Sequence, residues 1–248
     1  MAAKKILLAL QFWSGDAARA YELARYLADL EPHHNETADF MLCARKDCVL
    51  DRRVAFDVAR KFNVTTFNSR RDGVGWPHGC NDLWFDTMSF IWENITTGKF
   101  PQYKAVLTFE ADCVPLQKEW IARLHSAWDR RGHNEAIPVN LIGALQNYPS
   151  WHINGNAMFS ADLGYLKQIV RIGSCNPAHG WDYAIAPQLK KLGWKSVPEI
   201  RSIWNSKSIG PSGYAKFKNE QCALLHGVKD RSAFHLSRQD LLGVPLPS

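Results

Sequence analysis

The segment AVLTFEADCVP, residues 105–115, combines two features that rarely occur together in a buried strand. An apolar run leads directly into two carboxylates one residue apart, Glu110 and Asp112. In extended backbone, residues i and i+2 project to the same side, so these acids would repel each other unless a cation or a proton neutralises them. A divalent cation, Mn²⁺ or Mg²⁺, bound together with ligand phosphates would do so. A second interpretation stays open, in which Asp112 caps the next helix and Glu110 is solvated.

Alternating strand and helix patterns surround this segment. The strands are expected at residues 4–10, 39–44, 64–67 and 105–109, and the helices at residues 16–30, 54–61, 82–94 and 118–130. This alternation is typical of an α/β fold with a mostly parallel sheet. Ligands of such sheets bind beyond the carboxyl ends of the strands, and polar or charged residues follow each expected strand. The sequence therefore predicts a binding crevice at that edge.

The second half of the chain is less regular. After an expected strand at 139–145, the segment 148–159 is rich in Trp, His, Asn and Gly. Two further helices are expected at 161–170 and 182–192, and a strand at 196–203. Beyond Ile209 the chain is rich in Gly, Pro, Ser and Lys. Since no linker or internal repeat interrupts the pattern, we expect a single domain, residues 1–248.

The composition is that of a globular protein and excludes several classes. Of the 248 residues, 46% are apolar and 22% are charged, and no apolar run approaches the ~20 residues of a membrane span. The start, MAAKKILLALQFWSGD, lacks a small-residue cleavage site, so it predicts a first strand and a cytoplasmic protein (in the host cytoplasm if viral) with no membrane partner. The six cysteines form no C-x-x-C pair and are expected to be thiols.

The net charge of +6 favours an anionic partner, although a merely basic protein is an equally good interpretation. The chain has no G-x-x-x-x-G-K-[ST] loop, and its glycines at 73, 75 and 79 miss the dinucleotide-binding spacing. Near the C-terminal end, the segment LLHGVKD places His226 and Lys229 after a strand-like pair of leucines. Imidazole is a common ligand of transition metals, and the lysine suits a phosphate.

In their order along the chain, these features resemble a GT-A-fold glycosyltransferase. In that family a D-x-D motif binds Mn²⁺ or Mg²⁺ and the diphosphate of a nucleotide sugar, and the EAD of residues 110–112 matches it with Glu110 in place of the first Asp. By the same resemblance, His226 completes the metal site with Asp112. The resemblance implies a Rossmann-related α/β sandwich with a mostly parallel central sheet and an irregular C-terminal half. It also implies a nucleotide-sugar-binding half, residues 1–115, and an acceptor-binding half, residues 116–248.

The resemblance further implies roles for residues outside the metal site. The residues expected to bind the donor, with a UDP-sugar favoured, are Gln11, Trp13, Asp16, Arg45 and Lys229. The residues expected to bind the acceptor are Trp151, Asn154, Gly155, Asn156 and Trp181. If the reaction inverts the sugar configuration, Asp182 is the expected general base. Helix capping is the alternative role for Asp182, and it is also open for Asp16.

Two hypotheses of different classes follow. The first is a metal-dependent glycosyltransferase, whose acceptor would be a hydroxymethylated pyrimidine in DNA, as for the small GT-A-like enzymes of phages, or equally a glycan or protein. The second is a non-enzymatic nucleic-acid or nucleotide-binding α/β module, which accounts for the charge but not for the paired acids. A nucleotidyltransferase is disfavoured because its Gly-rich, Arg-containing first loop is missing.

Overall fold

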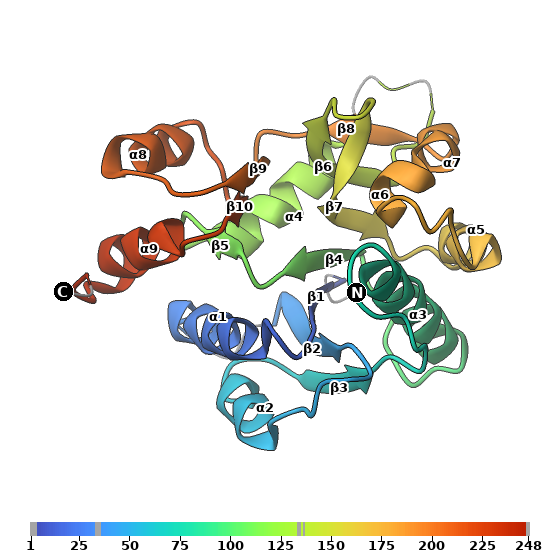
Figure 1. Cartoon of the computed structure of the whole chain (residues 1–248), viewed down its shortest axis with the longest axis horizontal. Coiled ribbons are helices and arrows are strands. Elements are labelled where there is room, and N and C mark those ends of the chain that lie inside the picture. Colours follow the sequence, from blue (N-terminus) through green and yellow to red (C-terminus); the bar gives the residue numbers. More distant parts are fainter. Residues whose placement is uncertain (1–3, 33–35, 133–134, 136, 247–248) are drawn as a thin grey trace.

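The computed structural model describes residues 4–32, 36–132, 135 and 137–246. These residues form three layers, with helices on both faces of a central sheet (Figure 1). The strands are β1 (Ile6–Phe12), β2 (Ala38–Ala44), β3 (Val64–Asn68), β4 (Ala105–Glu110), β5 (Cys113–Pro115), β6 (Leu141–Gln146), β7 (His152–Ser160), β8 (Trp194–Ser196), β9 (Ile200–Ser206) and β10 (Leu224–Val228). The helices are α1 (Ala17–Leu30), α2 (Arg52–Ala59), α3 (His78–Thr96), α4 (Trp120–Arg130), α5 (Leu163–Ile172), α6 (Trp181–Ala184), α7 (Ala186–Lys191), α8 (Pro211–Asn219) and α9 (Ser232–Leu242). The predicted α/β sandwich is confirmed.

The central sheet has seven strands in the order β3-β2-β1-β4-β7-β6-β8. β1 pairs in parallel with both β2 and β4, so that Leu8 lies opposite Phe40 on one side and Leu107 on the other. Strand β7 is antiparallel to both of its neighbours, whereas the other adjacent strands are parallel. The carboxyl ends of β1, β2, β3 and β4 therefore lie at one edge of the sheet, as the sequence predicts.

Two hydrophobic layers hold the sheet between its helices. Helices α1, α2, α4 and α9 contribute to the layer on one face, and helices α3 and α5 contribute to the layer on the other (Figure 1). β1 supplies both layers by alternation, with Leu8 and Leu10 on one face and Leu7 and Ala9 on the other. Full burial on both faces explains why the parallel strands read as continuous apolar runs.

A second sheet of three strands, in the order β5-β10-β9, begins directly after the two acids. β10 is antiparallel to β5 and parallel to β9, and His226 of β10 lies opposite Cys113 of β5. This pairing joins segments more than a hundred residues apart in the sequence. It brings the LLHGV strand to the end of β4, where the sequence pattern alone does not place it.

Two expectations for the second half are wrong, and prolines explain both of them. The helix expected at 182–192 is two short helices, because Pro187 cannot continue a helix and instead lies in the first turn of α7. The strand expected at 196–203 divides at Pro198 into β8 and β9, which belong to different sheets. The stretch after Ile209, for which no helix is expected from the sequence, contains α8 and α9.

All six cysteines are free thiols, as expected, and four of them are buried. Across the described part of the chain, each helix is too short or too polar to cross a bilayer.

Candidate functional site

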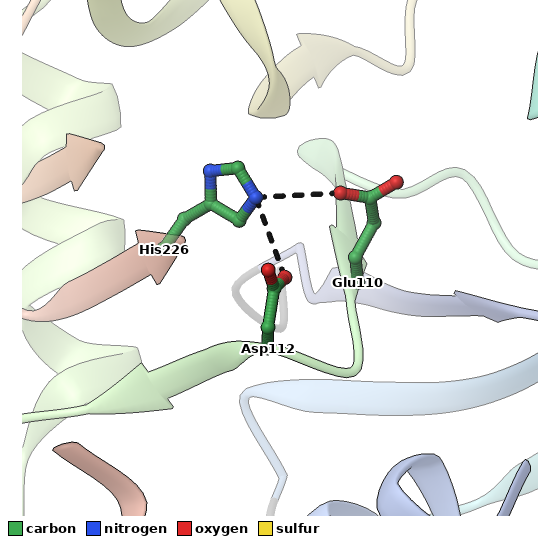
Figure 2. A group of neighbouring side chains, drawn as sticks. All are labelled: Glu110, Asp112 and His226. Carbon is green, nitrogen blue, oxygen red and sulfur yellow. Dashed lines mark ion pairs between the residues drawn. The ribbon is translucent and has the colours of Figure 1, made fainter. Parts of the chain in front are cut away.

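The two acids of the EAD motif converge on one histidine. Glu110 is the last residue of β4, Asp112 lies in the turn before β5, and His226 faces both from β10 (Figure 2). The Nε2 atom of His226 lies 3.3 Å from Oδ1 of Asp112 and 3.4 Å from Oε2 of Glu110. One ligand atom from each residue can be chosen so that all three lie within 4.8 Å of one another. The structure therefore brings together the three residues expected to bind a metal.

A glycine in β10, Gly227, allows the neighbouring His226 to face the two acids. Gly227 has a φ of +102°, and a Cβ there would lie 2.9 Å from the Cα of Trp204 in β9. The pairing register with β9 shifts between His226 and Val228, which is a β-bulge. Bulges re-aim the neighbouring side chains. Gly227 thus allows β10 to direct His226 toward the acids while it packs closely against β9.

Two cationic side chains neutralise the acids. The Nζ atom of Lys229 forms an ion pair with Oδ2 of Asp112. Burial would raise the pKa of Asp112, but His226 and Lys229 outweigh it and hold that pKa well below its usual range. Burial would likewise lower the pKa of His226, but the carboxylates of Asp112 and Glu110 outweigh it and raise that pKa to about 9. Among these side chains, two carboxylates are therefore balanced by an ammonium and an imidazolium.

The donor atoms fit a divalent cation. Oδ1 of Asp112 and Nε2 of His226 are buried, and apart from the ion pairs that join His226 to the two acids they make no hydrogen bond, so both remain available to a further ligand. The other ring nitrogen of His226, Nδ1, lies 3.0 Å from the hydroxyl of Ser202, which fixes the ring orientation as outer-shell partners of metal ligands do. Two carboxylates and one imidazole suit Mn²⁺, and Mg²⁺ accepts the carboxylates.

A buried amide positions the motif from β7. Oδ1 of Asn156 accepts hydrogen bonds from the Glu110 backbone N–H at 2.8 Å and from the Cys113 thiol at 3.0 Å. Its Nδ2 donates to Oε2 of Glu110 at 3.3 Å and to Oδ1 of Asn154 at 3.0 Å. The side chain expected to bind an acceptor is therefore already engaged with the EAD motif, and its acceptor role stays a prediction.

All five residues expected to bind the donor line a cavity of about 430 Å³ beside the acids. Gln11 is tied to Thr87 of α3 by a hydrogen bond of 3.0 Å. The guanidinium of Arg45 lies over the Trp13 ring, 5.1 Å from its centroid, and forms two hydrogen bonds with Asp47. Trp13 is 45% exposed, so its ring remains available to a flat ligand. Their role in donor binding stays a prediction.

The capping role considered for Asp16 is wrong. Asp16 occupies the N-cap position of α1, but its carboxylate makes no capping hydrogen bond and accepts one from Nε1 of Trp13 at 2.6 Å. Asp16 therefore orients an aromatic ring at the mouth of the first cavity.

A second cavity of about 470 Å³ adjoins the first one. Glu110 and Lys229 are among the residues that line both cavities, so the candidate metal site lies where the two meet. The expected acceptor residues Asn154, Gly155, Asn156 and Trp181 line the second cavity together with Asp182. Trp151 is 60% exposed and is not among the residues that line either cavity.

Asp182 is not a helix cap, because Gly180 is the N-cap of α6. Its Oδ2 accepts a hydrogen bond from the Gly155 N–H at 3.0 Å, and its Oδ1 accepts one from the Tyr183 N–H at 2.9 Å. Burial raises the pKa of Asp182, although His152 and the N–H groups of Gly155 and Tyr183 favour the ionised form. A raised pKa brings a carboxylate nearer to the range of an effective general base.

Sequence reasoning missed several residues of the second cavity. His152, Asn154 and Asn156 alternate along β7, and the period of a strand could have placed His152 beside the two asparagines. By contrast, Trp76, Tyr148 and Trp204 come from three separate segments that share no local pattern. Arg71 forms ion pairs with Asp82 and Asp86.

No protein-family model and no curated protein sequence matches the chain. Solved structures match it in fold. WbbM, described as a bifunctional glycosyltransferase, superposes with a TM-score of 0.56 at 11% identity, over 91% of this chain and 46% of that one. The glycosyltransferase GlyE of Streptococcus pneumoniae TIGR4 gives 0.50 at 10% identity, over 93% and 56%. An active-site mutant of LgtC gives 0.50 at 12% identity, over 96% and 97%.

The chain therefore has the GT-A fold, and the predicted resemblance is confirmed at the level of the fold. It spans about half the length of WbbM and of GlyE, so the activities of those proteins are not transferred with the fold.

Proposed function

We propose that the chain is a metal-dependent glycosyltransferase that moves a sugar from a nucleotide diphosphate donor, with a UDP-sugar favoured, to an acceptor hydroxyl. One observation carries the proposal. On a GT-A fold, Glu110, Asp112 and His226 converge where two cavities meet at the carboxyl edge of the sheet. Such an edge is where open α/β sheets bind their ligands.

The first cavity suits the donor. Trp13 offers a ring for a nucleobase, and Arg45 and Lys229 offer cations near the acids. Mn²⁺ or Mg²⁺, held by Asp112, His226 and Glu110, would stabilise the negative charge of the departing diphosphate. A metal held by Asp112 would neutralise that carboxylate, which would leave Lys229 available to the phosphates. The proposal thus assigns residues 1–115 mainly to the donor and residues 116–248 mainly to the acceptor.

The second cavity suits the attack on the sugar. In the inverting reaction, Asp182 takes the proton of the acceptor hydroxyl while the hydroxyl oxygen bonds to the anomeric carbon. The bond from that carbon to the diphosphate oxygen breaks, and the nucleoside diphosphate leaves with the electron pair. The N–H groups of Gly155 and Tyr183 hold the Asp182 carboxylate in place. Asp182→Asn should lower turnover by about 10²–10⁴-fold while UDP binding is kept.

The acceptor is the part of the proposal that the sequence leaves open. The net charge of +6 supports a polyanion, for which a hydroxymethylated pyrimidine in DNA is the prediction, with a glycan or protein as the alternatives. The free thiols support a reducing compartment such as the cytoplasm.

Calorimetric titration of UDP with and without Mn²⁺ tests the proposal, on the wild type, Asp112→Asn and a control, Asp129→Asn. Asp129 pairs with Lys104 on the surface and is 59% exposed, so its loss should change nothing. We expect metal-dependent UDP binding that Asp112→Asn abolishes. UDP binding that is equally tight with and without Mn²⁺, and equally tight in Asp112→Asn, would instead favour the non-enzymatic binding module. No UDP binding under any condition, followed by failure of GDP, CMP and dTDP, would refute the donor site.

A further inference from the structure

Three large aromatic side chains stand exposed around the second cavity. Trp76 is 73% exposed, Tyr148 is 77% exposed and Trp204 is 58% exposed, and all three line this cavity. They belong to the loop before α3, the loop after β6 and strand β9. Exposed apolar surface that gathers around a hollow indicates a binding site, whereas scattered exposed residues carry no such meaning.

Backbone packing fixes the strand that carries one of these rings. The close contact between Gly227 and the backbone of Trp204 holds β9 against β10, the strand that carries His226. The position of Trp204 is thereby coupled to the position of the candidate metal ligand. A ring that is exposed but mounted on paired strands loses little conformational freedom when it binds a flat ligand.

The floor beneath the rings is polar. His152 is buried, and its Nδ1 lies 2.8 Å from the Ser150 carbonyl oxygen, to which it donates. Its Nε2 atom lies 3.9 Å from Oδ2 of Asp182, which is too far for a hydrogen bond between the two atoms. At that separation both atoms can bond a hydroxyl group placed between them. Asn154 and Gln146 add amide groups to the same floor.

The charges around this cavity do not suit a phosphodiester chain. Among the described residues that line it, the carboxylates are Glu110 and Asp182, and the cations Lys229 and His226 are both paired with acids of the candidate metal site. A nucleic-acid site requires cations that displace the counterions of the phosphates. The positive net charge of the whole chain is therefore not concentrated where the acceptor would lie.

From this arrangement we infer that the second cavity binds an uncharged carbohydrate, whose ring packs on Tyr148, Trp204 and Trp76 and whose hydroxyls bond to His152 and Asp182. A sugar ring has an apolar C–H face and a polar edge, and the cavity offers aromatic rings at its rim and hydrogen-bonding groups at its floor. The inference rests on the proposed function, because it names the acceptor class of that reaction.

A panel of methyl glycosides and disaccharides, titrated by saturation-transfer NMR with and without UDP and Mn²⁺, tests the inference. We expect at least one sugar to bind the wild type, and Tyr148→Ala and Trp204→Ala each to weaken its binding roughly tenfold. Tyr148→Phe and Trp204→Phe keep a ring and should retain most of the affinity, which separates stacking from misfolding. Phe56→Ala is the control, since Phe56 is a 74% exposed aromatic residue on α2 and lines neither cavity of the site.

The outcomes separate this inference from the proposed function. Failure of every sugar while UDP and Mn²⁺ still bind would overturn the inference and leave the donor site intact. Binding of an oligonucleotide with hydroxymethylated pyrimidines, salt-dependent and insensitive to Tyr148→Ala and Trp204→Ala, would also overturn it. Sugar binding that Tyr148→Ala and Trp204→Ala weaken, by a protein that does not bind UDP, would support the carbohydrate cavity and refute the donor site.

Discussion

Replacing Gly155 by alanine should both destabilise the fold and displace Asp182, the candidate general base. A Cβ at Gly155 would lie 2.8 Å from Cζ2 of Trp181, well inside the ~3.5–4.0 Å of a favourable carbon–carbon contact. Trp181 cannot easily yield, because it stacks on the fully buried Trp84 at 3.7 Å between ring centroids, with 11° between the planes. The backbone at Gly155 does not itself require glycine, so the cost comes from the contact alone.

Overpacking of this kind costs about 1–3 kcal/mol, and a loss of about 2 kcal/mol would lower the melting temperature by roughly 4–8 °C for a chain of this length. Because Asp182 follows Trp181 and accepts a hydrogen bond from the Gly155 N–H, movement of the indole also displaces the carboxylate. We therefore expect Gly155→Ala to lower turnover more than it weakens UDP binding. Urea unfolding, thermal melts and steady-state kinetics with a UDP-sugar measure these effects.

Gly132→Ala is the matched control. A Cβ at Gly132 would have no neighbouring heavy atom within 4 Å, so the change should stay within about 1 kcal/mol. If Gly155→Ala were as stable as this control, the contact between β7 and Trp181 would not be as tight as described, and the reasoning would be refuted.

Three further predictions concern the metal site and its surroundings. Mn²⁺ should bind the protein about tenfold more tightly for each unit by which the pH rises between about 6.5 and 8.5, because it displaces the proton that the raised pKa keeps on His226. Calorimetry in two buffers of different ionisation enthalpy counts the released proton. A pH-independent affinity would contradict the prediction. Asn156→Ala should lower the free energy of unfolding by about 2–4 kcal/mol and weaken Mn²⁺ binding about 10–100-fold, since it removes the acceptor of the Glu110 N–H. Urea unfolding measures the first effect and metal titration the second. An unchanged metal affinity would show that this amide does not position the motif. Burial raises the pKa of Glu31 from 4.5 to about 7. Between these pH values the native chain keeps a proton that the unfolded chain has lost, so the free energy of unfolding should fall as the pH rises, by at most about 3 kcal/mol. Unfolding of the wild type and Glu31→Gln at pH 4.5 and 7.5 tests this, and equal slopes for the two proteins would disprove it.

Much of the first half of the chain was predictable from local sequence. Apolar runs buried on both faces mark β1, β2 and β4, and the polar residues after them lie at one sheet edge because parallel strands end together. Glu110 and Asp112 were recognisable for the same reason. Pro187 and Pro198 could also have been used to predict element boundaries, because proline interrupts helices and strands. The helix and the strand that were expected to continue across them were wrong.

The arrangement of the second half of the chain was decided by tertiary structure. His226 reaches the acids because β10 pairs with β5, and a pairing across more than a hundred residues leaves no periodic trace in the sequence. Asn156 supports Glu110 because β7 lies beside β4, although by composition it reads as a group available to a ligand. Trp76, Tyr148 and Trp204 form one rim only once their segments fold around the same cavity. Local sequence thus determines which segments are strands and helices and which residue types can act, whereas long-range packing determines which of them meet.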